Sequence, residues 1–237
     1  MGGVATVRAY LDLCRVSNLP TVWTNVAAAA FLADAAPPPG SLFLLVLSLS
    51  SFYLAGMALN DLCDRYYDEA HRPSRPLPSG QIAIGDAVRL TSFLVGIGFG
   101  ALTFAPHKSA LLWGVVLCAA IAVYDMHHKG NPFSVLIMGS CRFLLFAVVS
   151  IALSGHLPPQ VALAGLGQFA YVVAISVAAR CESARGGSSF PLIPLMLAGI
   201  SLLDGIFLAL FLKPIWLLCG AGGFFLTLAG QRFVRGD

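Results

Sequence analysis

The sequence predicts an all-α protein, a polytopic bundle of transmembrane helices, and two observations support this. Hydrophobic residues make up 58% of the 237 residues and charged residues only 11%, and the mean hydropathy is +0.83. Soluble domains rarely approach such values. Most of the chain consists of apolar runs long enough to cross a membrane, separated by short loops. Because no linker interrupts these runs, we expect a single transmembrane domain over residues 1–237.

About eight apolar segments are predicted to span the membrane. Most have the roughly 17–25 residues that a helix needs to cross ~30 Å of hydrocarbon, and the fourth is the shortest. The segments are 16–34, 41–59, 84–105, 109–125, 133–154, 160–179, 190–212 and 214–231. The residues before the first of these segments lack the basic region, apolar core and cleavage site of a signal peptide.

Lysine and arginine are distributed unevenly between the two sides of this bundle. One side carries ten of them: Arg8, Arg15, Arg65, Arg72, Arg75, Lys129, Arg180, Arg185, Arg232 and Arg235. The loops of the other side carry only Lys108 and Lys213. The positive-inside rule therefore predicts cytoplasmic termini and an even number of spans. We expect a multi-pass protein of the plasma (inner) membrane.

Polar loops follow every even-numbered span, at 60–80, 125–131 and 180–189, whereas the intervening loops are short or bland. All the candidate chemistry therefore faces one side. This arrangement favours a central cavity that opens to the cytoplasmic side over a channel through the membrane.

The stretch from Asn60 to Gly80 concentrates charge in a chain that has little. If the preceding helix continues through Asp68, then Asp61, Asp64 and Asp68 lie at i, i+3 and i+7 on one stripe. Neighbouring carboxylates ~6 Å apart would repel by roughly 2–3 kcal/mol per pair at an effective dielectric near 20. A divalent cation relieves that repulsion, and Mg²⁺ prefers one or two carboxylates together with water and phosphate oxygens.

The arginines of this stretch fit the same ligand. Guanidinium groups bind phosphate in bidentate fashion, so Arg72 and Arg75 are candidate phosphate partners. Prolines at 73, 76 and 78 prevent further helix and stiffen the loop that presents the arginines. The alternative is a solvated, charged loop between two spans. The stripe, the arginines and the prolines occur together, which favours a binding site.

This stretch resembles the first aspartate-rich motif of the UbiA-type membrane prenyltransferases. The pattern is Asn60-Asp61-x-x-Asp64-x-x-x-Asp68, then Arg72-Pro73-x-Arg75-Pro76-Leu77-x-x-Gly80. The resemblance implies a prenyl diphosphate donor bridged through Mg²⁺ to the three aspartates, which would be catalytic, with Asn60 beside the substrate. It also implies nine helices around a central cavity, one more than we predict.

A second cluster, Tyr124-Asp125-Met126-His127-His128-Lys129, closes the fourth span. The resemblance implies that Tyr124 and Lys129 contact the donor diphosphate, with Lys129 assisting catalysis. The alternative is an interfacial tyrosine and a snorkelling lysine. Adjacent histidines on a helix point about 100° apart and rarely share an ion, so we expect both to be interfacial.

A third cluster, Arg180 to Gly187, occupies the place of the family's second aspartate-rich motif but contains only one acid, Glu182. Glu182 would be a lone metal ligand there. Arg180 and Arg185 could instead neutralise the diphosphate directly. Together with Gly139-Ser140-Cys141-Arg142, this form resembles the EboC-like branch of the superfamily.

Several polar residues lie within predicted spans, where ionisable groups usually face the bundle interior. We expect Arg142 to reach the diphosphate and Asp204 to be structural. Arg15, Asn18 and Asn25 fall at i, i+3 and i+10, which predicts one shared helix face. The resemblance implies that Asn18 lines the substrate pocket. A helix–helix hydrogen bond explains these positions equally well.

The sequence therefore predicts an enzyme that transfers a prenyl group, with Mg²⁺, from a prenyl diphosphate to a lipophilic or aromatic acceptor. The alternative is a non-catalytic binder or carrier of lipid diphosphates whose second motif has degenerated. A CDP-alcohol phosphotransferase is disfavoured because the D-G-x-x-A-R spacing is absent. We expect membrane lipid around the protein and no nucleic-acid partner.

Overall fold

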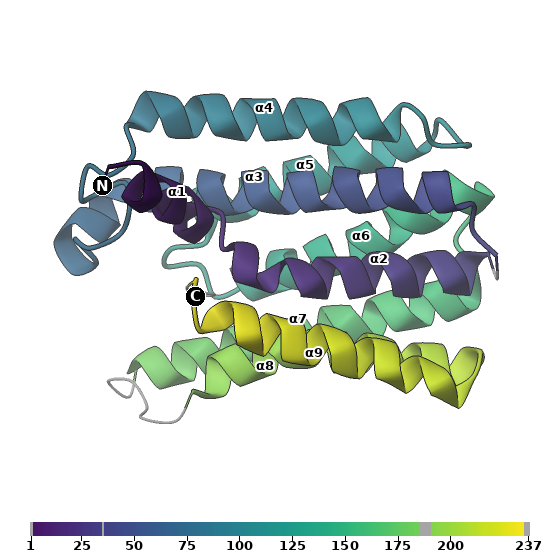
Figure 1. Ribbon diagram of the computed structural model, residues 1–237. Helices are drawn as coiled ribbons and strands as arrows, with labels where there is room; N and C mark the ends of the chain where they lie inside the picture. The colour runs from purple at the N-terminus through teal and green to yellow at the C-terminus, as the bar shows by residue number, and fades with distance from the viewer. Residues whose placement is uncertain (1, 35, 185–190, 235–237) are drawn as a thin grey trace.

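The computed structural model describes residues 2–34, 36–184 and 191–234, and the regular elements in these ranges are helices (Figure 1). Short 3₁₀ turns, Val16–Asn18 and Pro214–Trp216, precede two of them. The α-helices are α1 (Gly2–Leu13), α2 (Leu19–Ala33), α3 (Pro39–His71), α4 (Ile84–Leu102), α5 (Ala110–His127), α6 (Ser134–Ser154), α7 (Pro159–Ala184), α8 (Leu192–Phe211) and α9 (Leu217–Gln231). The predicted all-α bundle is confirmed.

Seven of the helices in the described ranges, α3 to α9, are long and apolar enough to cross a membrane. The remaining predicted span, 16–34, is shorter in the structure. Arg15 adopts a left-handed backbone conformation (φ 46°), the next three residues form a 3₁₀ turn, and α2 begins only at Leu19. The 15 residues of α2 extend about 22 Å, which is less than the hydrocarbon thickness.

Although α2 is short, it is the central helix of the bundle. It packs against α3, α6, α7, α8 and α9. Ala28, Ala29 and Ala30 are fully buried, and such small side chains let neighbouring helices approach closely. Polar residues on this helix therefore face other helices, and this determines where the buried polar groups described below can meet.

The helix α3 is unusually long and carries the candidate site. Its 33 residues extend about 50 Å, which exceeds the ~30 Å of hydrocarbon. Its last turns project past the ends of α2 and α9 (Figure 1). This helix continues through Asp68, which was the condition for the carboxylate stripe, and reaches His71.

The helix α1 has no counterpart among the predicted spans. It lies beside the projecting end of α3, at the end of the bundle where α9 finishes (Figure 1). Ala9 and Leu13, one turn apart, are buried in a small cluster with Ala58, Leu77 and Ile82. This cluster fastens α1 and the loop after α3 onto the same end of the bundle.

Close glycine contacts hold α8 and α9 together. A Cβ atom on Gly220 would lie 2.8 Å from the Gly205 Cα and 2.7 Å from the Ser201 carbonyl oxygen. Only glycine fits at that separation. The contact leaves Asp204, next to Gly205, buried against the other helices.

Candidate functional site

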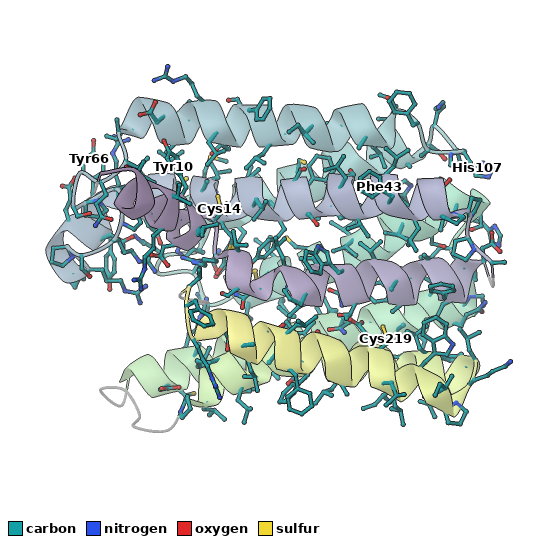
Figure 2. The ribbon with its side chains drawn as sticks, viewed as in Figure 1. Tyr10, Cys14, Phe43, Tyr66, His107 and Cys219 are labelled. Carbon is teal, nitrogen blue, oxygen red and sulfur yellow. The ribbon has the colours of Figure 1, made fainter. Side chains whose placement is uncertain are left out.

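Three carboxylates line one stripe of the projecting end of α3, as the spacing predicted. Asp61, Asp64 and Asp68 are only 4%, 9% and 1% exposed. Tyr66, on the opposite side of the helix, is 70% exposed, and Figure 2 shows it at this end of the bundle, with His107 at the other end. The carboxylates thus face the protein, so this part of α3 differs from a solvated charged loop.

Two arginines from different segments bind Asp61. The Arg15 Nη2 atom donates to the Asp61 Oδ1 atom at 3.0 Å, and the Arg75 Nη1 atom approaches the same oxygen at 3.3 Å. Arg75 also donates to the Asp68 Oδ2 atom at 2.7 Å. The left-handed backbone of Arg15 is costly for a residue other than glycine. It turns the chain between α1 and α2 at the residue that pairs with Asp61.

The loop after α3 presents Arg75 to the carboxylates. Its backbone closes on itself, because the Ile82 amide donates to the Pro76 carbonyl at 3.2 Å and the Ser79 amide donates to the Arg75 carbonyl at 3.0 Å. Leu77 and Ile82 are buried beneath it. Arg72 is exposed, and its guanidinium forms no ion pair with Asp61 or Asp68 in the described part of the chain, so the two predicted phosphate arginines are placed differently.

Asp64 is held by the segment that follows α5. The Lys129 Nζ atom lies 2.7 Å from the Asp64 Oδ1 atom, and the His128 Nε2 atom lies 3.4 Å from Oδ2. The hydrogen bond to Asp64 raises the pKa of His128 above its ordinary value. The Tyr124 ring stacks on His128 with ring centres 5.0 Å apart. His128 was expected to be interfacial, and the structure adds a contact, because the turn after α5 directs its ring at Asp64.

Asn60 links this cluster to a carboxylate that the site prediction omitted. Its Oδ1 atom accepts from Arg15 at 3.3 Å, and its Nδ2 atom donates to the Asp125 Oδ1 atom at 3.1 Å. Asp125 is 4% exposed, and its Oδ2 atom has no hydrogen-bond partner among the described residues. The available signal was its place beside Tyr124, which lines the same cavity.

The cluster adjoins an apolar cavity of about 270 Å³. Arg15, Asn60 and Asp125 line the cavity, whereas Asp61, Asp64 and Asp68 do not, and we call this charged end of the cavity its mouth. Residues of α2, α3, α5, α6, α7 and α8 line it, and most are aliphatic or aromatic. Its polar lining includes Arg15, Asn18, Thr21, Tyr53, Asn60, Tyr124, Asp125, Arg142 and Ser176. The predicted lining role of Asn18 agrees with this geometry. The Gln231 Nε2 atom donates to the Asn18 Oδ1 atom at 3.1 Å, which ties the end of α9 to the cavity wall.

A wider depression of about 700 Å³ adjoins the cavity. Tyr124, Met138, Ile175 and Ser176 line both spaces. The depression is also lined by the basic side chains Arg72, His128 and Arg180. An amphiphile could therefore place an anionic head at the basic depression and its apolar part in the cavity.

Arg142 lies apart from the carboxylate stripe. Its Nη1 atom donates to the Asn25 Oδ1 atom at 2.6 Å, and its Nη2 atom donates to the Thr21 Oγ1 atom at 3.2 Å. Asn25 also donates to Asp204. The prediction that Arg15, Asn18 and Asn25 share one helix face was wrong, because the left-handed turn and 3₁₀ segment rotate Arg15 away from α2.

The third cluster is only partly described. Arg180 donates to the carbonyl oxygens of Pro132 and Asn131, both at 3.0 Å, and to the Ser134 Oγ atom at 2.7 Å. These bonds brace the loop before α6. One Glu182 carboxylate oxygen is buried without a partner in the described part of the chain. Arg185 lies outside the described residues.

The fold and the site together define a polytopic helical membrane protein with an apolar cavity that has a charged mouth. The UbiA prenyltransferase family model matches residues 21–230, from the first turn of α2 to the last turn of α9. The chain belongs to that family.

Curated relatives from archaea and bacteria match part of the chain. A digeranylgeranylglyceryl phosphate synthase from Sulfolobus acidocaldarius is 29% identical over 120 residues, covering 51% of this chain and 42% of the relative. A 4-hydroxybenzoate octaprenyltransferase from Pectobacterium atrosepticum is 28% identical over 156 residues, covering 63% and 54%. The chain thus matches about half the length of these curated relatives.

Solved structures share the fold over nearly the whole chain. A digeranylgeranylglyceryl phosphate synthase structure matches with a TM-score of 0.66 and 18% identity, covering 97% of this chain and 95% of that one. A UbiA homologue from Archaeoglobus fulgidus, bound to GPP and Mg²⁺, matches with a TM-score of 0.62 and 16% identity, covering 93% and 86%. At these identities the likeness concerns the fold.

Proposed function

We propose that the protein is a prenyltransferase that moves a prenyl group from a prenyl diphosphate to a lipophilic or aromatic acceptor. One observation carries the proposal: three buried carboxylates, each paired with cationic side chains, lie at the mouth of an apolar cavity in a UbiA-family chain. The names of the curated relatives and the GPP and Mg²⁺ in a homologous structure support it.

The residues at the mouth fit Mg²⁺ only when the substrate supplies ligands. Within the described ranges, no three His, Cys, Asp or Glu side chains converge as a metal-binding group. Mg²⁺ is usually held by one or two carboxylates plus substrate phosphates and water, so a complete protein cage is unnecessary. Asp61, Asp64 and Asp68 would hold it, and Glu182 is a further candidate. When bound, Mg²⁺ would neutralise the diphosphate charge that develops as the donor ionises.

The chain's own cations would stabilise the departing diphosphate. Arg15, Arg75 and Lys129 lie within 2.7–3.3 Å of the carboxylates, so a diphosphate held at those carboxylates through Mg²⁺ would lie close to them. As the bond between the allylic carbon and the diphosphate oxygen breaks, positive charge develops on the prenyl group. The apolar cavity excludes water from it until the acceptor forms the new bond and loses a proton.

Finer assignments extend this proposal. The single acid of the third cluster and the Gly139–Arg142 segment favour the EboC-like branch. The basic side, which carries the charged mouth, would face the cytoplasm by the positive-inside rule, with the chain in the plasma membrane. Tyr124 and Arg72, which line the basic depression, would contact the donor diphosphate, and Arg185 is a further candidate partner.

A second candidate function is a non-catalytic binder of lipid diphosphates. The hydrogen bonds of Arg180 favour it, because the guanidinium binds the loop before α6 and the first residue of α6 instead of facing the carboxylates. Such a protein would bind the donor and release no diphosphate. The two candidates therefore differ in turnover and share donor binding.

A turnover assay separates the two candidate functions. The purified protein, in lipid nanodiscs, is incubated with geranyl diphosphate, Mg²⁺ and a lipid extract. We expect diphosphate release and a prenylated lipid, both abolished by chelation of Mg²⁺. In Asp64→Asn, donor binding should weaken by at least tenfold, since a charge-assisted contact contributes about 1.5–3 kcal/mol. Asp86→Asn is the matched control, because Asp86 forms an exposed pair with Arg89 on α4. Donor binding without release of diphosphate would support the binder.

A further inference from the structure

A cluster of polar side chains is buried in the interior of the apolar bundle, away from the carboxylate stripe. Asn25 on α2 and Gln168 on α7 are fully buried, and Asp204 on α8 is 1% exposed. Asn25 donates to both Asp204 oxygens at 2.9 and 2.7 Å, and Gln168 donates to the Asp204 Oδ1 atom at 2.7 Å. Ionisable groups in such places are costly and usually functional.

Arg142 joins this cluster to the cavity. It lines the cavity and donates one hydrogen bond to Asn25 and one to Thr21. A guanidinium has five N–H donors in a fixed fork, so further donors remain for a ligand. Within the described residues, no carboxylate lies within 4.0 Å of Arg142, whereas Arg15, Arg75 and Lys129 each have one.

Buried residues on α2, α7 and α8 fix the orientation of Arg142. The Asn25 amide is fixed at both ends, since its oxygen accepts from Arg142 and its nitrogen donates to Asp204. Gln168 holds Asp204 from α7. Asp204 therefore holds Asn25 so that the amide oxygen of Asn25 stays pointed at the guanidinium of Arg142.

Arg142 also lies deeper than the mouth. It follows Ser134, the first residue of α6 and a partner of Arg180, by eight positions, which is about 12 Å along a helix. Thr21, a hydrogen-bond partner of Arg142, likewise lies six positions after Arg15, which is at the mouth. The mouth already offers Arg15, Arg75, His128 and Lys129 to a diphosphate. The donor head group therefore does not need Arg142.

We propose that Arg142 binds an oxyanion of the acceptor, a carboxylate or a phosphate, inside the cavity, and that Asn25 and Asp204 are positioning residues for it. This inference rests on the proposed prenyl transfer. A cation that faces an apolar space without a directly contacting counter-ion is costly, and a ligand oxyanion relieves that cost through charge-assisted hydrogen bonds. An acceptor anchored in this way would turn its nucleophilic end toward the mouth, where the donor carbon lies.

Equilibrium dialysis with two matched probe pairs tests the proposal and distinguishes the two anion sources. The pairs are 4-hydroxybenzoate with phenol, and phosphatidic acid with diacylglycerol. We expect wild type to prefer the anion in at least one pair. In Arg142→Gln, that anion should bind about ten- to a hundredfold more weakly, while its neutral partner and geranyl diphosphate bind as before. Arg142→Lys should retain part of the preference, since the charge remains but the fork is lost.

Asp204→Asn tests the positioning role. We expect it to reduce the ratio of anion to neutral affinity by several-fold and to leave geranyl diphosphate binding unchanged. A purely structural network would lower the melting temperature of both variants and leave that ratio unaltered, which would overturn the proposal. An anion preference in neither probe pair would also overturn it. Because dialysis needs no turnover, an anion site in a protein that never consumes a prenyl diphosphate would refute the proposed function alone.

Discussion

The sharpest energetic test of the mouth is the replacement of Arg75 by glutamine. Arg75 is the charged partner of Asp68, at 2.7 Å, and its side chain is 12% exposed while that of Asp68 is 2% exposed. Removing one member of a buried ion pair typically costs 3–5 kcal/mol, because the other charge stays buried. Asp61 keeps Arg15 as a partner, so we expect the lower end, about 3 kcal/mol.

Arg89→Gln is the matched control, because its pair with Asp86 is equally short but exposed. That distance is 2.6 Å, and the side chains are 80% and 43% exposed. Exposed pairs contribute about 0–1 kcal/mol, so burial alone separates the two variants.

Thermal unfolding in detergent is the assay. A loss of about 3 kcal/mol corresponds to a melting temperature lower by about 6–12 °C for a chain of this size. Mg²⁺ should recover part of the loss in Arg75→Gln, since it would replace the missing positive charge. Equal melting temperatures for the two variants would refute the reasoning that the buried carboxylates depend on Arg75.

Three further predictions follow from other contacts. Asp64 raises the pKa of His128, so their pairing is complete below the ordinary pKa of about 6.5 and lost as pH rises through the raised value. Calorimetry should therefore show Mg²⁺ affinity rising as the pH increases above about 6.5, and His128→Gln should flatten this rise. Gly220→Leu should destabilise the fold by about 1–3 kcal/mol in thermal unfolding through contact with Gly205, whereas Gly222→Leu, with nothing within 4 Å, should not. Arg180→Lys should speed proteolysis of residues 128–133, because lysine cannot bridge Ser134 and the carbonyl oxygens of Asn131 and Pro132. The control variant Arg89→Lys should be cleaved at the wild-type rate.

The parts of this molecule that follow from local periodicity could be predicted from the sequence. An apolar run fixes a transmembrane helix, and the i, i+3 and i+7 spacing fixes three carboxylates on one stripe once the helix continues. The structure agrees on both counts, and Asp61, Asp64 and Asp68 are buried together. The same reasoning failed for Arg15, because a single left-handed residue removes the helical relation between it and Asn25.

Contacts between distant segments could not be predicted in this way. His128 meets Asp64, and Asp125 meets Asn60, only because α3 and α5 pack side by side. Arg142 likewise contacts Asn25, 117 residues earlier in the chain, and the spacing of residues does not indicate that contact. Periodicity assigns a side chain to a helix face, and the packing of other helices decides what that face meets.

The pairing at the mouth also explains how the chain tolerates three buried carboxylates. Isolated buried charges would be costly, but Arg15, Arg75, His128 and Lys129 compensate them. If Mg²⁺ and a diphosphate bind there, the metal can take over the carboxylates while the cations turn to phosphate oxygens. Binding would then exchange one set of ion pairs for another. Because neither partner alone completes that exchange, donor and metal should bind cooperatively, each raising the affinity for the other.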